Sequence, residues 1–238
     1  MAQRFFVPKA RFSEERISFT DEQRKQIRNV LRLRPGDMVS VFDGSGLEFA
    51  VRLESAETGE VVGTTTPQTE SLRRITLVQG LPKGDKIEFI IQKCTEVGVF
   101  EFIVAETARS VPRIAPEKMK ARLSRWNSIA TEAAEQSGRV RVPEVSGIVS
   151  FKQALQDTSE HAHRVIAWES ERDEDVSPEL VLPSGQTDLV IFIGPEGGFT
   201  AEEVGLARES GVTPISLGSR ILRTETAAVV ASALAIYR

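Results

Sequence analysis

The sequence contains very little cysteine and histidine. Cys94 is the single cysteine among 238 residues, which excludes an internal disulfide and fits a protein kept in a reducing compartment. Because Cys94 falls within a helical pattern, we expect a buried structural thiol there rather than a nucleophile. The two histidines, His161 and His163, have no Cys or His partner at ligand spacing, so we expect no metal site.

Long apolar runs and the common phosphate-binding loops are also missing. No stretch approaches the roughly 20 apolar residues that cross a bilayer, and residues 1–8 lack the apolar core of a signal peptide. We therefore expect a cytoplasmic protein without a membrane partner. Neither Gly-x-x-x-x-Gly-Lys-Ser/Thr nor a Gly-x-Gly-x-x-Gly loop that opens a helix occurs, which argues against either kind of phosphate cradle.

The net charge of −4 is unevenly distributed along the chain. Residues 1–34 hold nine Lys and Arg against four Asp and Glu, a local charge of +5. Residues 109–141 hold eight against three, again +5. Phosphate binding depends on such local fields more than on the total charge. Either patch taken alone is equally compatible with a solvated face that has no partner.

The first 70 residues predict a small β-rich domain with one helix. Thr20 to Gln23 has the spacing of a capping box, which opens a helix predicted to reach about Arg32. The glycines of 43–46 could be mistaken for a Rossmann-type loop, but the period of two that follows predicts a hairpin. The predicted strands are 4–7, 16–19, 38–42, 47–53 and 60–65, and 67–72 is the candidate linker.

From residue 74 onward, strands alternate with helices. This order predicts an α/β domain with a mostly parallel sheet that is covered on both faces. The predicted strands are 74–78, 100–104, 164–168, 189–193 and 215–217, and the predicted helices are about 85–97, 116–136, 151–156, 200–210 and a closing helix to Tyr237.

Two loops of the carboxyl-terminal part follow predicted strands directly. One is Gly194-Pro195-Glu196-Gly197-Gly198, and the other covers residues 217–227. In open α/β sheets, ligands bind at the carboxyl ends of the strands. Glycines allow close backbone approach while Pro195 stiffens the turn, which suits a nucleoside without phosphates held by backbone hydrogen bonds and apolar packing. A stretch of this kind by itself is usually a tight turn.

Taken together, residues 194–199 and 217–227 resemble the knotted carboxyl-terminal region of SPOUT-class methyltransferases. Within that class they are most similar to the RsmE family, which methylates N3 of a uridine in small-subunit (16S) ribosomal RNA. Segments 86–99, 109–110 and 132–139 extend the resemblance over nearly the whole chain. Cys94 and Val97 depart from the alanine and leucine expected in the family, which changes only packing.

The resemblance implies a fold and a cofactor. It implies a PUA-like β-barrel RNA-binding domain at residues 1–70 and a knotted SPOUT methyltransferase domain at residues 73–238; the pattern of elements alone would not predict a knot. It also implies that S-adenosylmethionine lies bent among three loops. The implied cofactor-binding residues are Trp168, Glu169, Ile193, Gly194, Gly197, Leu217, Gly218, Ile221, Leu222 and Thr226. Leu217, Ile221 and Leu222 would sandwich the adenine, although the same residues equally suit an ordinary core.

Methylation of uracil N3 requires removal of a weakly acidic imide proton. Arg223 and Arg220 are suitable donors to the charge that develops on the flanking carbonyl oxygens. Glu225 is the nearest carboxylate that could act as the base or orient one. A structural role is equally open for Glu225, because an acid in the first turn of a helix is stabilising. We expect Glu196 to stabilise its turn rather than to act in catalysis.

The expected partners are 16S ribosomal RNA, within the small ribosomal subunit, and a second copy of the chain. The closing helix is apolar nearly all round, so it is either buried within the domain or packed on a twin, and the resemblance implies a homodimer. Two other functions stay open: a SPOUT ribose 2′-O-methyltransferase acting on rRNA or tRNA, and a non-catalytic RNA-binding module. The expected RNA contacts are Arg4, Arg11, Arg24, Arg28, Arg32, Arg109, Gln136 and Arg139.

Overall fold

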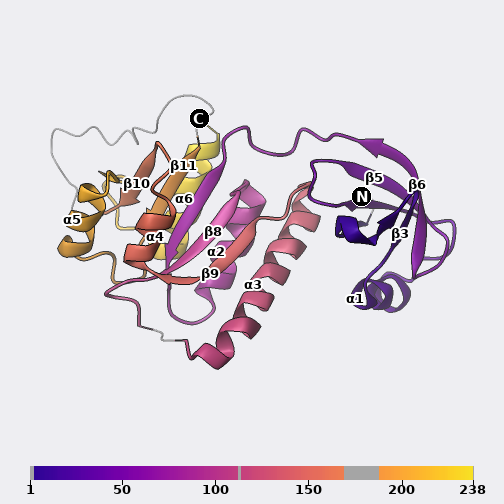
Figure 1. The fold of residues 1–238 in the computed structure, drawn as a ribbon, viewed down its shortest axis with the longest axis horizontal. Coiled ribbons are helices and arrows are strands. Elements are labelled where there is room, and N and C mark those ends of the chain that lie inside the picture. Colours follow the sequence, from indigo (N-terminus) through magenta and orange to yellow (C-terminus); the bar gives the residue numbers. More distant parts are fainter. Residues whose placement is uncertain (1–2, 112–113, 169–187, 238) are drawn as a thin grey trace. The chain divides into compact units, whose positions relative to one another are not determined.

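A computed structural model describes residues 3–111, 114–168 and 188–237, which form two compact units (Figure 1). The first unit comprises Met1–Glu70 and Ala134–Val142, and the second comprises Ser71–Ala133 and Pro143–Arg238. The break after Glu70 falls within the predicted linker. The sequence did not predict that residues 134–142 belong to the first unit. Their first part continues a helix that begins in the second unit. None of the described helices combines the length and apolarity that a membrane span requires.

The first unit is built on a curled six-stranded sheet. Its strands lie in the order β1-β4-β5-β6-β3-β2. The predicted hairpin about residues 43–46 is present as the antiparallel pair β4 and β5, in which Val39 faces Val51. Phe5, Phe19 and Ile27 are fully buried in its core. The strands are β1 Arg4–Phe6, β2 Phe12–Ser13, β3 Arg16–Ser18, β4 Met38–Phe42, β5 Glu48–Leu53 and β6 Thr58–Thr65, and a short 3-10 turn spans Lys9–Arg11.

The helix of the first unit starts as predicted but does not continue regularly. The capping box between Thr20 and Gln23 is present, with both reciprocal hydrogen bonds. The α-helical part, α1, covers only Asp21–Lys25, and a π-helical turn, η2, follows over Gln26–Val30. The prediction of one regular helix to Arg32 is therefore wrong. The wider turn closes with Leu31 N donating to Gln26 O at 2.9 Å, and Arg32 then takes a positive φ of 54°.

Glu70 holds residues 139–141 within the first unit. Its Oε1 accepts hydrogen bonds from the amides of Val140 and Arg141, and its Oε2 pairs with the Arg139 guanidinium at 2.7 Å. Phe42, Ala134 and Val140 form a small apolar cluster beside this contact. These interactions explain why 134–142 belong to the first unit although they are distant from it in sequence.

The second unit contains a six-stranded sheet in which every neighbouring pair is parallel. The order is β12-β10-β11-β7-β8-β9. The edge strand β9 was not predicted, because Gly147 and polar residues interrupt its apolar pattern, and pairing with β8 stabilises it. The strands are β7 Ile75–Gly80, β8 Glu101–Glu106, β9 Glu144–Ser150, β10 Arg164–Ala167, β11 Leu189–Ile193 and β12 Thr213–Ile215.

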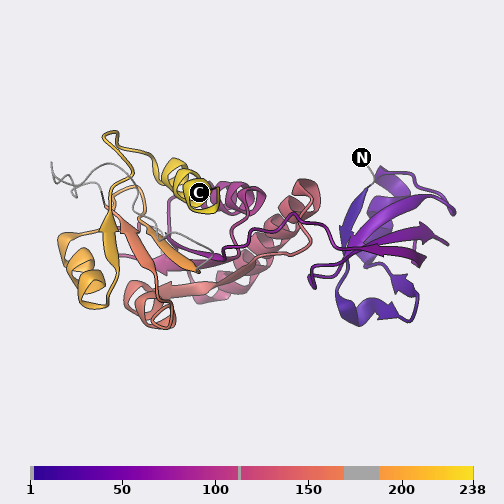
Figure 2. The same cartoon turned by 90° about the horizontal axis from the view of Figure 1, so that it is seen from above.

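Helices cover both faces of this sheet, as predicted. Helix α6 (Thr224–Ile236) packs on β7, β11 and α2 (Lys86–Val97), whereas α4 (Phe151–Asp157) and α5 (Ala201–Glu209) lie on the other side (Figure 2). The long helix α3 (Pro116–Ser137) joins α2 through an ion pair between Arg125 and Glu88.

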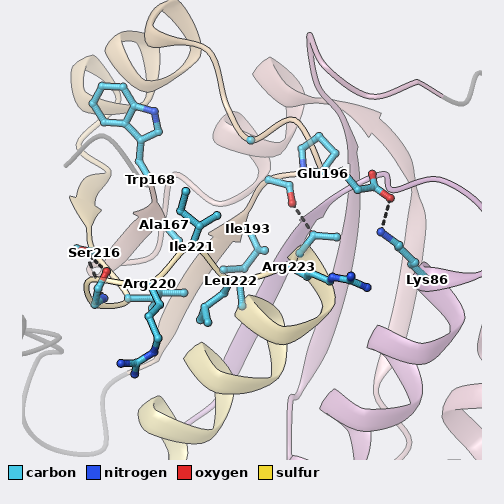
Figure 3. Close-up of a pocket in the computed structure, with 17 residues that line it drawn as sticks. Lys86, Ala167, Trp168, Ile193, Glu196, Ser216, Arg220, Ile221, Leu222 and Arg223 are labelled. Carbon is cyan, nitrogen blue, oxygen red and sulfur yellow. Dashed lines mark hydrogen bonds and ion pairs between the residues drawn. The ribbon is translucent and has the colours of Figure 1, made fainter. Parts of the chain in front are cut away.

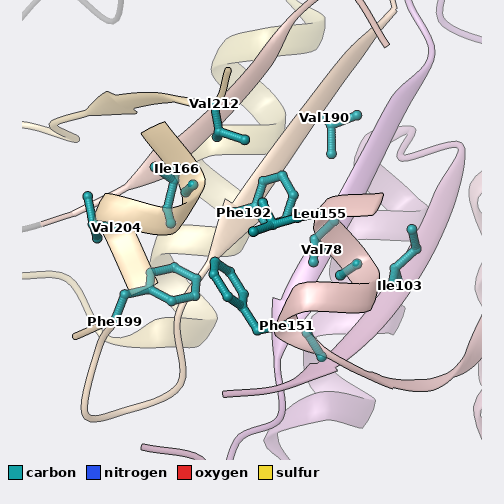
Figure 4. Packing of buried hydrophobic residues seen from close by; sticks show 13 residues of the cluster. Val78, Ile103, Phe151, Leu155, Ile166, Val190, Phe192, Phe199, Val204 and Val212 are labelled. Atoms are coloured by element: carbon teal, nitrogen blue, oxygen red, sulfur yellow. The ribbon is translucent and has the colours of Figure 1, made fainter. Parts of the chain in front are cut away.

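An apolar cluster under α4 and α5 fixes the strands whose loops form the site. The Phe151 ring lies 6.0 Å from that of Phe192 and 5.3 Å from that of Phe199 (Figure 4). Ile166 of β10 and Val190 of β11 are fully buried in the same cluster. Because close-packed side chains resist displacement, β10 and β11 present their loops from a rigid base.

Candidate active site

A cavity of about 370 Å³ lies where the loops after β10, β11 and β12 meet (Figure 3). This is the carboxyl edge of the sheet, where the sequence predicted a ligand. The cavity wall includes these residues predicted to bind the cofactor or to act in catalysis: Trp168, Ile193, Gly194, Leu217, Gly218, Arg220, Ile221, Leu222 and Arg223.

The glycine loop after β11 packs tightly against the end of β7. A Cβ atom added to Gly80 would stand 2.6 Å from Pro195 Cδ and 2.8 Å from Pro195 N. A Cβ atom added to Gly194 would stand 3.1 Å from the backbone of Gly198. The loop can therefore take this course only because these two positions lack side chains.

A buried hydrogen-bond chain joins this loop to the start of α6. Thr224 Oγ1 donates to the carbonyl oxygen of Gly194 at 2.6 Å, and Gln79 Nε2 donates to Thr224 Oγ1 at 2.9 Å. Gln79 is fully buried and Thr224 is 5% exposed. The sequence analysis selected neither residue as part of the site. Gln79 could have been selected, because a polar residue near the end of an apolar strand indicates a buried hydrogen bond.

Three charged side chains meet beside the cavity. Lys86 Nζ lies 2.9 Å from Glu196 Oε1 (Figure 3). It lies 3.6 Å from Glu225 Oε2. The carboxylate of Glu196 also accepts the amide hydrogen bond of Lys83, at 3.1 and 3.2 Å to its two oxygens. Lys86 belongs to the cavity wall, and sequence reasoning did not select it because its acidic partners are more than a hundred residues away.

The ion pair changes the protonation behaviour of both partners. The hydrogen bond to Glu196 raises the pKa of Lys86 above its usual value, against the effect of burial. Burial alone would raise the pKa of Glu196, but the hydrogen bond from Lys86, those from the Glu196 and Lys83 amides, and the Lys86 charge together hold it below its usual value. Both groups are therefore charged at neutral pH.

The two arginines of the wall point in different directions. In Figure 3 the side chain of Arg223 extends toward α2 and Lys86, whereas that of Arg220 extends away from them. Arg223 also immediately precedes α6, whose first turn contains Glu225. Arg223 and Lys86 thus mark one end of the cavity, and Arg220 lies outside that grouping. Glu225, which the sequence predicted for catalysis, is not itself part of the described wall; it reaches this end through its contact with Lys86.

Three apolar residues of the wall, Leu217, Ile221 and Leu222, are not part of the core. Ile221 is 75% exposed, and Leu217 and Leu222 are half-buried. An ordinary core role, left open by the sequence, does not describe them. Exposed apolar side chains beside a cavity are typical of a surface that a ligand covers.

Three predicted cofactor residues are not part of the described wall. Gly197 lies outside it, and its carbonyl oxygen accepts a hydrogen bond of 2.6 Å from Arg109 Nη1. Thr226 is exposed on α6, because the helix turns Thr224 and Ala227, not residue 226, toward the cavity. Glu169 lies outside the described residues.

The predicted RNA contacts differ in accessibility. Arg28, Arg32, Arg109 and Gln136 are exposed. Arg11 and Arg24 are partly buried, and both donate to the carbonyl oxygen of Phe19.

Arg4 and Arg139 do not fit the predicted RNA contact. The Arg4 side chain is 17% exposed, pairs with Glu48 at 2.8 Å and donates to Arg139 O. Arg139 is 3% exposed and pairs with Glu70. For Arg139 a structural role replaces the predicted one, because a buried, paired guanidinium does not reach a phosphate. Arg4 is partly buried, and its contacts with Glu48 and Arg139 both lie within the first unit.

The wall suits a ligand that has both an apolar ring and polar edges. Leu217, Ile221 and Leu222 provide apolar surface, and the glycine loop presents backbone groups at close range. The cavity volume lies in the range of small-molecule sites, about 300–1,000 Å³. Within the described part of the chain, no group of three His, Cys, Asp or Glu could hold a metal ion. S-adenosylmethionine, with an adenine ring and a sulfonium, fits these residues.

Comparison with known proteins identifies relatives over almost the full length. Residues 69–236 match the family described as RNA methyltransferase domain, and residues 19–65 match RNA methyltransferase PUA domain. Ribosomal RNA small subunit methyltransferase E of Bacillus subtilis is 39% identical, covering 99% of this chain and 96% of that protein. The Synechocystis protein of the same name is 34% identical, with coverages of 98% and 77%.

A solved structure shows the same similarity. The ribosomal RNA small subunit methyltransferase E of Neisseria gonorrhoeae, crystallised with S-adenosylmethionine, superposes with a TM-score of 0.87 at 32% identity. The alignment covers 98% of this chain and 96% of that one. The similarity thus includes both units of the chain.

Proposed function

Because the chain belongs to the RNA methyltransferase family that includes the ribosomal RNA small subunit methyltransferase E proteins, we propose that it methylates N3 of a uridine in 16S ribosomal RNA. The predicted fold class, a knotted SPOUT domain with a PUA-like domain before it, is confirmed. The predicted enzyme class and the predicted cofactor, S-adenosylmethionine, are confirmed as well.

We propose binding roles for the residues of the cavity wall. S-adenosylmethionine, when bound, supplies a methyl group on a positively charged sulfur. Leu217, Ile221 and Leu222 would cover the adenine, and the backbone of Ile193, Gly194 and Gly218 would satisfy its polar edge. Glu169, Gly197 and Thr226 are left out of this proposed set.

The acceptor end is the end of the cavity marked by Arg223 and Lys86, with Glu225 beside Lys86. Arg223 donates hydrogen bonds to the carbonyl oxygens that flank N3, where negative charge develops. Glu225 accepts the N3 proton, so that the electron pair of the broken N–H bond stays on N3. The single observation that carries this assignment is the orientation of the Arg223 side chain toward Lys86 (Figure 3), whose ammonium lies 3.6 Å from Oε2 of Glu225.

RNA binding is assigned to the accessible basic residues. Ribosomal RNA is the substrate class of the family, and we propose the assembled small subunit, in the cytoplasm, as its source. The exposed residues Arg28, Arg32 and Gln136 of the first unit and Arg109 of the second are the proposed contacts, with Arg11 and Arg24 in support. Residues 1–70 would bind RNA, and residues 73–238 would carry catalysis.

A homodimer is part of the proposal. Phe89 on α2 is 48% exposed, and Leu234 at the end of α6 is 37% exposed. Because α2 and α6 pack against each other, both side chains can belong to one face that a second copy would cover. Light scattering of the purified protein is expected to give twice the chain mass, and a monomer would remove this part of the proposal.

The test of the reaction is product identification. The purified protein is incubated with labelled S-adenosylmethionine and undermethylated small subunits, and the modified nucleoside is identified. N3-methyluridine is the expected product. Ribose methylation would instead make the protein a 2′-O-methyltransferase, and no transfer would leave an RNA-binding module.

A further inference from the structure

Lys86 connects three segments that build the acceptor end of the cavity. It is the first residue of α2, its partner Glu196 lies in the glycine loop after β11, and Glu225 lies in the first turn of α6. The side chains are 35%, 29% and 19% exposed, respectively. Their contacts are therefore only partly screened by solvent.

Glu196 is the fixed member of the group. It accepts hydrogen bonds from the Lys83 amide as well as from Lys86, so both ends of its carboxylate are anchored to the segment that opens α2. Lys86 is held in turn by the short contact of 2.9 Å. The ammonium consequently has a defined position from which to act on Glu225.

The Lys86 ammonium supplies the positive charge that faces the buried carboxylate oxygen of Glu225. Oε2 is buried, and no donor among the described residues lies within hydrogen-bonding distance of it. Lys86 Nζ, at 3.6 Å, is the cation that faces it. Burial of a carboxylate oxygen is costly without an opposite charge nearby. Glu196 from the glycine loop and Arg223 from the segment before α6 are charged residues of the cavity wall at this end.

We propose that Lys86 is a positioning residue for methyl transfer: it holds Oε2 of Glu225 so that the other oxygen, Oε1, is presented to the N3 proton. This inference rests on the proposed role of Glu225 as the proton acceptor. Lys86 itself does not touch the reacting atoms. It acts on the rate of the chemical step through Glu225, and it leaves the apolar adenine site unchanged.

The test is a double-mutant cycle of Lys86→Met and Glu225→Gln, measured on methyl transfer to small subunits. Lys86→Met keeps the length of the side chain and removes its charge. We expect this change to lower kcat at least tenfold, to leave KM for S-adenosylmethionine within threefold, and to have no further effect when Glu225→Gln is present. Lys86→Arg, which keeps the charge, should restore most of the rate.

The matched control is Lys93→Met. Lys93 lies on the same helix, is 37% exposed and pairs with Glu96 at 2.8 Å, away from the cavity. It should leave kcat unchanged. The inference would be overturned if Lys86→Met and Glu225→Gln lowered kcat independently of each other. It would also be overturned if Lys93→Met lowered kcat as much as Lys86→Met does.

A measurement without turnover separates this inference from the proposed function. The ¹³C resonance of the Glu225 carboxyl, assigned by its loss in Glu225→Gln, should move in Lys86→Met and stay in place in Lys93→Met. Calorimetry with the demethylated cofactor should give the same affinity for the three variants Glu225→Gln, Lys86→Met and Lys93→Met. An unmoved resonance would refute the contact itself, whereas a moved resonance in an enzyme that makes no N3-methyluridine would refute the proposed function alone.

Discussion

Thr224 Oγ1 lies 2.6 Å from the carbonyl oxygen of Gly194, and this contact joins the first residue of α6 to the glycine loop thirty residues before it. The hydroxyl donates to Gly194 and accepts from Gln79 Nε2, so its single proton and one lone pair are both used inside the protein. The contact holds the start of α6 against the glycine loop, and both segments line the cavity.

Replacing Thr224 by valine tests this contact, because valine keeps the shape and removes the hydroxyl. Gly194 O and Gln79 then each lose a buried partner, which should cost about 1–3 kcal/mol of unfolding free energy. Cofactor affinity should fall as well, since the loops are no longer held together. Urea unfolding and calorimetry measure the two effects. Thr226→Val, at an exposed position two residues on, should change neither.

Gly80→Ala should disrupt the glycine loop. The new methyl group would stand 2.6 Å from Pro195 Cδ, so the loop must move away from β7. We expect a loss of about 1–3 kcal/mol, as for overpacking in a core, together with loss of cofactor binding. Gly205→Ala in α5 is the matched control, because no atom lies within 4 Å of its added methyl group. It should stabilise the protein by roughly 0.5–1 kcal/mol, and a similar loss at both sites would contradict the explanation.

Arg223→Ala should lower kcat at least a hundredfold while leaving cofactor affinity near normal. The guanidinium is proposed to stabilise the negative charge that develops on the carbonyl oxygens of the target uracil. Loss of one such hydrogen-bond donor typically lowers kcat by a factor of about 10²–10³. Arg220→Ala should have a smaller effect, because that side chain extends away from the acceptor end (Figure 3). Single-turnover kinetics and calorimetry separate the two quantities. Loss of cofactor binding in Arg223→Ala would make Arg223 a cofactor or folding residue.

The Lys86–Glu196 pair predicts how stability depends on pH. The pKa of Glu196 is lowered from 4.5, so its contribution is present above that pH and disappears as pH falls through the lower, folded-state value. The pKa of Lys86 is raised from 10.5, so its contribution is present below that pH and disappears as pH rises through the higher, folded-state value. The stability difference between the wild type and Lys86→Met should therefore be constant from about pH 6 to 9 and shrink outside that range. Urea midpoints measured across pH test this, and a constant difference down to pH 3 would contradict it.

Arginines of the first unit should separate into two groups. Arg28→Ala and Arg32→Ala, at exposed positions, should weaken RNA binding and each lower the salt slope by about one, without loss of stability. Arg139→Ala should instead destabilise the protein by about 1–3 kcal/mol, because it removes a buried guanidinium and leaves the partly buried Glu70 without its cation. RNA titrations at several salt concentrations and urea unfolding distinguish the groups. A stable Arg139→Ala protein with weakened RNA binding would restore the original prediction for Arg139.

The sequence by itself determined the local features of this protein. The capping box of Thr20 and Gln23, the hairpin at 43–46 and the order of strands and helices all depend on residues within a few positions of one another. The location of the ligand site followed from the same information, because loops after parallel strands meet at one edge of the sheet. The family resemblance added Trp168, Ile193 and Leu217 to that site without coordinates, and all three line the cavity.

Tertiary structure alone decided which distant residues meet. Lys86 and Glu196, or Gln79 and Thr224, are separated by more than a hundred residues, and no spacing rule pairs them. The burial of Arg139 likewise depends on Glu70, and the π-helical turn at 26–30 replaced a regular pattern that propensity favoured. Local periodicity encodes which face of an element is apolar, whereas the partner of a polar group is set by packing between elements, where a shift of one turn exchanges one partner for another.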